Sequence, residues 1–318
     1  MSHDNTQPAP LDLPMCRQLA DLVSEHAINE GINETRIPGL EVYRADQPTS
    51  FSSVVYEPAL CVIAQGSKTV QLGDKEILYG PLSYMISAVE LPVGGCVIDA
   101  TPNAPYLAVK LSLNQQEIAE LVLELGDELP PLDQQRDCPA ASCGLCVAPL
   151  DTGILQAMTR LVALLSSPTD ARVLAPLVRR EIIYRALMGE MGWRLRDFVA
   201  TDTQAHRISK VIAVLKDRFA EPLRVRELAE DVNMSESTLF HTFKQVTRMS
   251  PVQFQKKLRL HEARRLMLTE GLEAATASYR VGYESPSHFS REYRRMFGAP
   301  PRADVTKLRG DQAMVASL

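Results

Sequence analysis

The sequence predicts an α+β multidomain protein, in which a β-barrel with flanking helices precedes a helical connector and an all-α domain. Three observations lead to this prediction. Short apolar runs separated by Gly and Pro fill residues 36–113. Two amphipathic segments with the period of a helix follow. From residue 205 onward the pattern predicts helices joined by tight turns. The length of 318 residues agrees with about two domains.

The N-terminal segment is predicted to be a disordered tail over residues 1–14, followed by a helix over residues 15–31. The predicted helix has apolar residues at helical spacing, namely Cys16, Leu19, Leu22, Val23 and Ile28. The segment lacks the basic start and apolar run of a signal peptide. No stretch approaches the ~18 apolar residues of a membrane span, so we expect a cytoplasmic protein without membrane contact.

Residues 36–113 are predicted to form a sheet domain. Strand-length apolar runs recur at intervals of roughly 8–12 residues, which is typical of an all-β sandwich or barrel. Gly-containing pairs such as those at 66–67, 73–74 and 94–95 separate the runs as turns. A helix over residues 114–126, with Asn114 at its start and Gly126 at its end, closes this domain.

Residues 127–203 are predicted to be a linker and connector. Residues 127–149 are rich in Pro and Cys and show little periodicity, which favours a loop. Amphipathic helices are expected over residues 152–166 and 176–189, the second with Leu177 on its apolar face. Their apolar faces fit either a dimer seam or packing within the chain.

The charge of the chain is divided unevenly along its length. Residues 1–203 carry 14 Lys and Arg against 26 Asp and Glu, a net charge of −12, whereas residues 204–318 carry 20 against 13, a net charge of +7. The overall net charge of −5 therefore conceals a basic C-terminal third. An acidic body with a basic C-terminal domain is the distribution expected of a protein whose C-terminal part contacts phosphate.

The basic C-terminal third contains an internal repeat. Residues 225–235 align with residues 274–284, and Leu239 and Phe243 align with Phe289 and Tyr293 after a turn that is one residue longer. Each copy reads as a short helix, a tight turn and a second helix that begins at a serine cap. This is the helix-turn-helix pattern, whose second helix can lie in a DNA major groove. A helix of about 27 Å between the copies would let one chain read a non-palindromic site.

Two C-terminal segments carry a resemblance to a known family, residues 257–268 (KLRLHEARRLML) and residues 280–298 (RVGYESPSHFSREYRRMFG). They resemble the DNA-binding domain of the AraC/XylS family of bacterial transcription regulators. Residues 37–44, 56–66 and 91–95 resemble the cupin-like N-terminal domain of one AraC subgroup. Ala274 and the ending after Gly298 depart from the family pattern without threatening the assignment.

The resemblance implies a cupin-like sensing domain at residues 15–126, connector or dimerisation helices at 127–203, a double helix-turn-helix at 204–303 and a tail at 304–318. It implies a sequence-specific regulator, either an activator or a repressor, controlled by an effector or by thiols through the N-terminal domain. The implied partners are double-stranded DNA, RNA polymerase, an unknown small molecule and a second copy of the chain. The alternative is a stress or electrophile sensor that acts through protein partners.

The predicted DNA contacts lie opposite the expected core faces of the two recognition helices. On the first helix they are Ser237, Phe240, His241 and Lys244. On the second helix they are Ser287, His288, Arg291, Arg294 and Arg295. Arg291 is the strongest candidate for reading a base, because its guanidinium can bond O6 and N7 of guanine together. Phe240 either contacts a thymine methyl or packs half-buried, and any one Arg either reads a base or contacts phosphate alone.

Metal chemistry, cofactors and enzymatic activity are not expected. No histidine occurs between His26 and His206, and iron or manganese cupin sites normally include imidazole. Cys61, Gln65, Tyr84 and Met85 are expected on strands, at positions that could line an effector cavity.

Six cysteines in a cytoplasmic chain are expected to be reduced. Cys16, Cys61 and Cys96 are expected to be buried. Cys138, Cys143 and Cys146 have the spacing C-x4-C-x2-C in the predicted linker. They are either incidental, a thiol switch, or an incomplete metal or cluster site, since no fourth cysteine follows.

Overall fold

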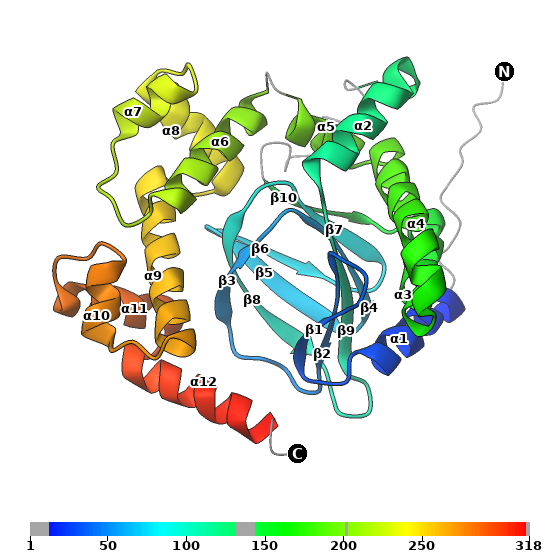
Figure 1. Ribbon diagram of the computed structural model, residues 1–318, viewed down its shortest axis with the longest axis horizontal. Coiled ribbons are helices and arrows are strands. Elements are labelled where there is room, and N and C mark those ends of the chain that lie inside the picture. Colours follow the sequence, from blue (N-terminus) through cyan, green and yellow to red (C-terminus); the bar gives the residue numbers. More distant parts are fainter. Residues whose placement is uncertain (1–12, 132–143, 201–202, 316–318) are drawn as a thin grey trace.

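The computed structural model describes residues 13–131, 144–200 and 203–315, and its N-terminal part contains two antiparallel sheets packed face to face (Figure 1). The six-stranded sheet has the order β1-β2-β9-β4-β7-β10 and the four-stranded sheet the order β3-β8-β5-β6. The larger sheet consists of β1 (Gly31–Glu34), β2 (Leu40–Ala45), β4 (Ala59–Gln65), β7 (Ser83–Ser87), β9 (Tyr106–Ser112) and β10 (Leu145–Pro149). The smaller sheet consists of β3 (Ser52–Tyr56), β5 (Ser67–Leu72), β6 (Lys75–Tyr79) and β8 (Leu91–Asp99).

The two sheets do not join into the closed barrel that the resemblance implied. In the described residues β1 and β10 end the larger sheet and β3 and β6 end the smaller one, so each sheet keeps two edges. The N-terminal domain is therefore an open, sandwich-like version of the predicted fold, in which side chains rather than a continuous hydrogen-bond ladder fill the space between the layers.

The six-stranded sheet is buried on both faces. In β4, Leu60, Val62 and Ala64 point to an outer apolar core, whereas Cys61 and Ile63 point between the sheets. This alternation follows from the two-residue period of a strand. The outer core is supplied by helices, and the inner core by the opposing sheet.

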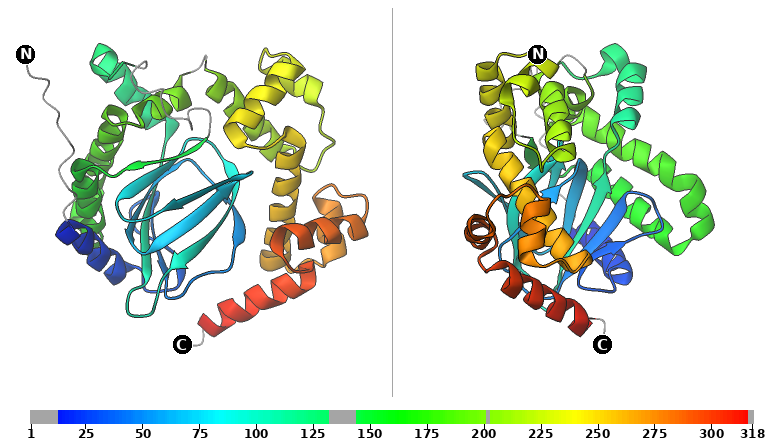
Figure 2. Two further views of the ribbon diagram at one scale, coloured as in Figure 1. Left: turned by 180° about the vertical axis from the view of Figure 1, so that it is seen from behind. Right: turned by 60° about the vertical axis from the view of Figure 1, so that its left-hand side comes forward.

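Helices cover the sheets from two sides (Figures 1 and 2). The helices on the side of the larger sheet are α1 (Leu13–His26), α2 (Gln115–Leu125), α3 (Thr152–Ala163), α4 (Pro168–Met188) and α5 (Gly192–Val199), with 3₁₀ turns at Gly126–Glu128 and Leu164–Ser166. The helices on the other side are α6 (Gln204–Asp217), α7 (Val225–Asp231), α8 (Glu236–Thr247), α9 (Pro251–Thr269), α10 (Ala274–Arg280), α11 (Pro286–Phe297) and α12 (Pro301–Val315). None of the described helices combines the length and apolar character that crossing a membrane requires.

The helix predicted over residues 15–31 is shorter than expected. It ends at His26, and after four residues the chain enters β1 at Gly31, which has a φ of +91°. Asn33 closes this bend, because its side chain accepts from the Asn29 N–H at 3.0 Å and donates to the Asn29 carbonyl at 2.7 Å. Ile28 is consequently 82% exposed rather than part of the core.

The prediction of a loop over residues 127–149 is wrong for the last five of these residues. Leu145–Pro149 form β10, which pairs with β7, and Leu145 and Ala148 are buried there. Pro149 is accommodated because it ends a strand at the sheet edge, where no ladder hydrogen bond is lost.

The second connector helix begins eight residues before its predicted start at Pro176. It starts at Pro168, which occupies the first turn, and Pro176 lies inside it. The serine-proline pair at 167–168 is the true start signal. Leu177, predicted on the apolar face, is 62% exposed. The tail predicted from residue 304 is also wrong over residues 304–315, which belong to α12.

The described residues form three apolar cores. The first joins the outer face of the larger sheet to α1–α5. The second begins between the two sheets and continues without a break into α6, α7, α8 and the start of α9. The third holds the rest of α9 together with α10, α11 and α12. The first helix-turn-helix therefore shares its core with the sheets, whereas the second has a core of its own.

Replacement of Leu60 by Ala tests the two-faced burial of the larger sheet. Leu60 is fully buried in the outer core, so Leu60→Ala is expected to lower the free energy of unfolding by about 2–5 kcal/mol. The matched control is Leu78→Ala on β6, where the side chain is 66% exposed and the expected change is within about 0.5 kcal/mol. Equal effects in urea unfolding followed by circular dichroism would contradict this assignment of the faces.

Candidate nucleic-acid interface and interior cavity

Both copies of the sequence repeat fold as helix, turn and helix. The turn between α7 and α8 places Asn233 at φ +53°, and the turn between α10 and α11 places Gly282, its counterpart in the repeat, at φ +85°. The Ser235 hydroxyl accepts from the Thr238 N–H at 3.1 Å, and the Ser285 hydroxyl accepts from the His288 N–H at 3.3 Å. These caps and left-handed turns set the start of each second helix.

In the second helix of each unit, the residues predicted to face the core are buried. Leu239, Phe243 and Val246 of α8 are buried, as are Phe289 and Tyr293 of α11. The predicted DNA contacts of both helices are exposed: Ser237, Phe240, His241, Lys244, Ser287, His288, Arg291, Arg294 and Arg295. Phe240 is 40% exposed, which leaves it able to pack and to contact a partner.

Four of these side chains are cations without an internal partner. Within the part of the chain that the structure describes, Lys244, Arg291, Arg294 and Arg295 form no ion pair. Glu292, the carboxylate on α11, is instead held by Lys256 at 2.6 Å and by the Tyr283 hydroxyl at 3.1 Å. The exposed face of α11 is thus positively charged and available to phosphate.

Helix α9 ties the two units together. Ser250 and Gln253 form a capping box at its start. Arg259 donates to the carbonyl of Phe219 at 2.6 Å, to that of Gly282 at 2.9 Å, and to two further carbonyls at residues 220 and 221. One guanidinium therefore satisfies backbone groups of both units, which fixes their relative orientation.

A second network fixes α12 against α11. Arg264 of α9 forms two hydrogen bonds to the Asp304 carboxylate, at 2.8 and 2.9 Å, and the Tyr293 hydroxyl donates to the same carboxylate at 2.7 Å. Burial raises the pKa of Tyr293, so its hydroxyl stays protonated and keeps donating. Asp304 thus joins three helices at a buried point.

The helical units contact the sheets at polar as well as apolar points. The Ser53 hydroxyl of β3 lies 3.0 Å from Nε2 of His261 on α9. Burial, with the nearby charges of Arg264 and Lys257, lowers the pKa of His261 to about 3, so the ring is neutral at physiological pH. The Gly144 N–H, next to β10, donates to the Val246 carbonyl of α8 at 2.8 Å.

A cavity of about 230 Å³ lies between the sheets. Of the side chains predicted to line it, Cys61 and Met85 do so. Tyr84 packs in the outer core instead, and Gln65 donates to the Pro105 carbonyl at 2.8 Å. Four tyrosines and two lysines share the wall, namely Tyr43, Tyr56, Tyr79, Tyr106, Lys68 and Lys110.

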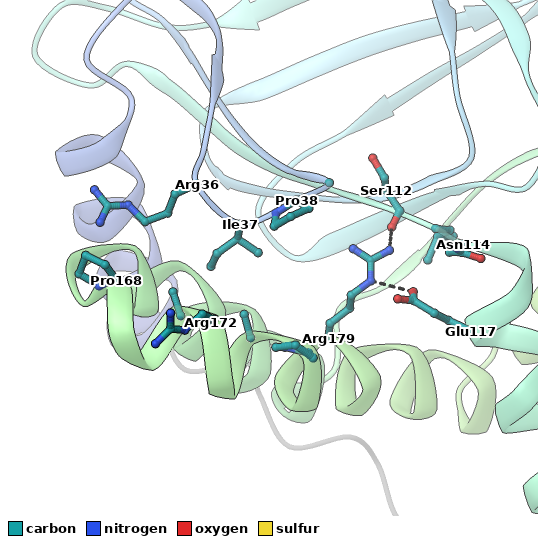
Figure 3. Close-up of a pocket in the computed structure, with 14 residues that line it drawn as sticks. Arg36, Ile37, Pro38, Ser112, Asn114, Glu117, Pro168, Arg172 and Arg179 are labelled. Carbon is teal, nitrogen blue, oxygen red and sulfur yellow. Dashed lines mark hydrogen bonds and ion pairs between the residues drawn. The ribbon is translucent and has the colours of Figure 1, made fainter.

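A larger groove of about 1,240 Å³ lies between α4 and the loop before β2. Figure 3 shows Arg179 turned toward Ser112 and Glu117, with Arg36 at the opposite end of the groove. Arg179 donates to the Ser112 carbonyl and, at 2.7 Å, to the Glu117 carboxylate. The charge of Arg179 is therefore balanced within the fold by Glu117.

The predicted thiol switch is only partly described. Cys146 is buried in β10, whereas Cys138 and Cys143 lie outside the described residues. Cys16 is buried as predicted, and Cys61 and Cys96 are half-buried. In the described ranges no three His, Cys, Asp or Glu side chains gather as a metal site would require.

Three side chains of these sites were not predicted from the sequence. Lys68 shares a strand face with Val70 and Leu72, and this two-residue alternation was the available signal that it points inward. Arg259 and His261 lie on a helix rich in basic residues, where nothing local separates a buried side chain from a solvated one.

Comparison with known proteins gives matches to both parts of the chain. The family model described as the AraC-type transcriptional regulator N-terminus matches residues 36–194, half of the chain, and a helix-turn-helix domain model matches residues 228–305. The HTH-type transcriptional activator RhaS of Salmonella arizonae is 31% identical over 148 residues, which cover 46% of this chain and 53% of that protein. RhaS of Salmonella typhimurium is 29% identical over 153 residues, which cover 48% and 55%. The chain thus spans about half the length of these curated relatives.

Solved structures of ToxT from Vibrio cholerae share the fold over most of the chain. Wild-type ToxT with a bound unsaturated fatty acid has a TM-score of 0.57 at 12% identity, covering 84% of this chain and 94% of that one. An apo ToxT variant has a TM-score of 0.54 at 11% identity, covering 86% and 99%. At such low identity the likeness concerns the fold alone.

Removal of the Asp304 carboxylate is expected to loosen the second unit. Asp304→Ala leaves Arg264 without its counter-charge at a largely buried point, which is expected to cost about 3–5 kcal/mol of unfolding free energy. The control is Glu273→Ala, which breaks an exposed pair with Arg302 and is expected to cost about 0–1 kcal/mol. Chemical unfolding of the full chain measures both, and a cost for Asp304→Ala no larger than the control's would contradict the anchoring role.

Proposed function

Because the chain belongs to the AraC-type transcriptional regulators, we propose that it binds double-stranded DNA with both helix-turn-helix units and that its N-terminal domain controls this binding. The observation that carries the proposal is the exposed face of α11, where three arginines have no ion-pair partner among the described residues. Basic side chains kept free on a recognition helix are suited to phosphate and to guanine.

The spacing of the two units supports reading by a single chain. Helix α9 has 19 residues, a length of about 28 Å at ~1.5 Å per residue. Successive major-groove faces of DNA are about 34 Å apart, so recognition helices before and after α9 are suitably separated for adjacent turns. A site read in this way has no need of palindromic symmetry.

The proposed contacts divide between the two helices. Ser237, Phe240, His241 and Arg291 are assigned to base edges, and Lys244, Arg294 and Arg295 to the DNA backbone. Ser287 and His288 lie on the same exposed face of α11 and complete the proposed interface.

Control by a bound small molecule is the favoured form of regulation. Strand β3 contributes Tyr56 to the cavity wall and Ser53 to the contact with His261, so it touches both the cavity and α9. ToxT, which shares this fold, has been solved with a fatty acid bound, which supports ligand control. Cys146 is buried, and a buried thiol is a poor sensor, so thiol control stays a prediction that rests on the other two cysteines.

Dimerisation is proposed through α4. Val173, Leu177, Tyr184 and Met188 are exposed and recur at spacings of 4, 7 and 4 residues, which places them on one face of the helix. Apolar side chains aligned in this way are typical of helix pairing between subunits. We assign RNA polymerase as a further partner, because the relatives matched are transcriptional activators.

Replacement of Arg291 by Ala tests the base-reading assignment. DNA sites selected from a random pool provide the ligand, and fluorescence anisotropy gives the affinity. Arg291→Ala is expected to lose about 1–3 kcal/mol of binding and to relax preference at one base position. Arg302→Ala, an exposed arginine on α12 that is paired with Glu273, serves as control and is expected to bind as the wild type does.

Two results would count against the DNA proposal. Equal weakening of the Arg291→Ala variant on every DNA sequence refutes base reading but leaves phosphate contact intact. An affinity of the wild type that barely changes with salt refutes the phosphate-binding mode itself and favours a protein partner.

Replacement of Leu177 by Glu tests the dimer seam. A charge in the middle of the apolar face of α4 is expected to convert a dimer to a monomer in light scattering coupled to size-exclusion chromatography. Leu123→Glu on α2, where the side chain is 82% exposed, is the control and is expected to leave the mass unchanged. A wild type that is monomeric at micromolar concentration, or a Leu177→Glu variant that stays dimeric, contradicts the assignment.

A further inference from the structure

Lys68 projects from β5 into the cavity between the sheets. It shares a strand face with Val70 and Leu72, both fully buried, and is itself only half-buried. Its Nζ lies 5.4 Å from the ring centre of Tyr56 on β3 and 5.9 Å from that of Tyr43 on β2. A cation is therefore held between the two sheets, against aromatic faces from both.

Lys68 has no carboxylate partner among the residues that the structure describes. The other lysine of the wall, Lys110, is paired with Glu41 at 3.2 Å. The groups that interact electrostatically with Lys68 are the hydroxyls of Tyr43 and Tyr56 and the thiol of Cys61. Lysine is seldom withdrawn from solvent without a carboxylate beside it, so this half-buried position is unusual for a purely structural lysine.

The surrounding groups keep Lys68 protonated but supply no formal negative charge at neutral pH. Burial opposes the charge on Lys68, but Tyr56 and Tyr43 more than offset burial and raise its pKa, so the ammonium form persists at neutral pH. Burial raises the pKa of Cys61 to about 11 and that of Tyr79 well above its usual value, so these neighbours are neutral. A protonated lysine donates hydrogen bonds and does not act as a nucleophile toward a carbonyl.

We propose that this cavity binds a small organic acid as its carboxylate, with Lys68 as the counter-ion. The inference rests on the proposed ligand control and specifies the ligand's chemistry. Met85 and Ala108 offer an apolar wall for the body of the acid, and tyrosine hydroxyls can add donors to the carboxylate. The volume of about 230 Å³ is below the ~300–1,000 Å³ usual for drug-sized ligands, which selects a compact acid.

Other ligand classes fit the cavity less well. A cationic ligand would meet the charge of Lys68 directly, since Glu41 is already engaged by Lys110 and Glu57 is exposed at the rim. A neutral ligand would leave Lys68 without a counter-ion. A carboxylate supplies the missing charge and gains a charge-assisted hydrogen bond, which is about twice as strong as a neutral one.

The test compares acids with neutral and cationic molecules of the same shape, on the full chain. Calorimetric titrations use benzoate against benzyl alcohol and benzylamine, and hexanoate against hexanol and hexylamine. The acid of at least one series is expected to bind about tenfold or more tightly than its alcohol, with no binding of the amine. Lys68→Met is expected to abolish this preference, and Lys68→Arg to retain it.

A charge-neutral control separates Lys68 from the other lysine of the wall. The double variant Glu41→Gln/Lys110→Met removes the existing ion pair without altering net charge, and is expected to keep the preference for the acid. Absence of any preference for an acid over its alcohol in both series overturns the proposal, as does a preference that survives Lys68→Met.

Failure of this inference is distinguishable from failure of the proposed function. Lys68→Met is expected to bind the selected DNA sites as the ligand-free wild type does. Normal DNA binding without acid preference rejects the carboxylate site alone. Acid binding that depends on Lys68, together with no DNA binding, rejects the proposed regulator and leaves the site standing.

Discussion

The apolar core that runs from between the two sheets into the first helix-turn-helix constrains the rest of the molecule. Buried side chains of the sheets, such as Leu91 and Val93, belong to the same cluster as Phe243 and Phe254 of α8 and α9. Separating the first unit from the sheets would expose this surface, at roughly 25 cal/mol for each Å² of apolar area. Motion of the first unit as a free body is therefore disfavoured, and α8 is presented from a fixed support.

The second helix-turn-helix is held differently. Its core is separate, and Arg264, Asp304 and Tyr293 tie α9, α11 and α12 into one block. Ser53 and the neutral ring of His261 link α9 to β3 by a polar contact. A single hydrogen bond contributes about 0.5–1.5 kcal/mol, far less than the shared core, so this contact holds the second unit to the sheets more weakly than the core holds the first.

The parts that could be predicted from the sequence are those set by local rules. Ser235, Ser285 and Gly282 mark helix starts and a turn within a few residues, and the repeat makes each copy confirm the other. The misses depend on distant partners. β10 pairs with β7, more than fifty residues earlier, and α12 is held by a carboxylate whose partners lie on α9 and α11. The grouping of Lys68 with tyrosines from other strands follows from sheet packing, which no local pattern encodes.

The positive residues of the chain take three different roles according to the acceptors around them. Arg259 donates hydrogen bonds to backbone carbonyls and Arg264 donates to a carboxylate, so both side chains have structural roles. The arginines of α11 face solvent without an internal ion pair in the described residues, and Lys68 faces a cavity without one. Other cations of the described chain also lack an ion pair, so it is the position of these residues that matters. The arginines lie on the exposed face of the second helix of a helix-turn-helix, and Lys68 lies in the wall of a cavity, where each can meet a partner from outside the chain. The partner that we propose is phosphate at α11 and a carboxylate at Lys68.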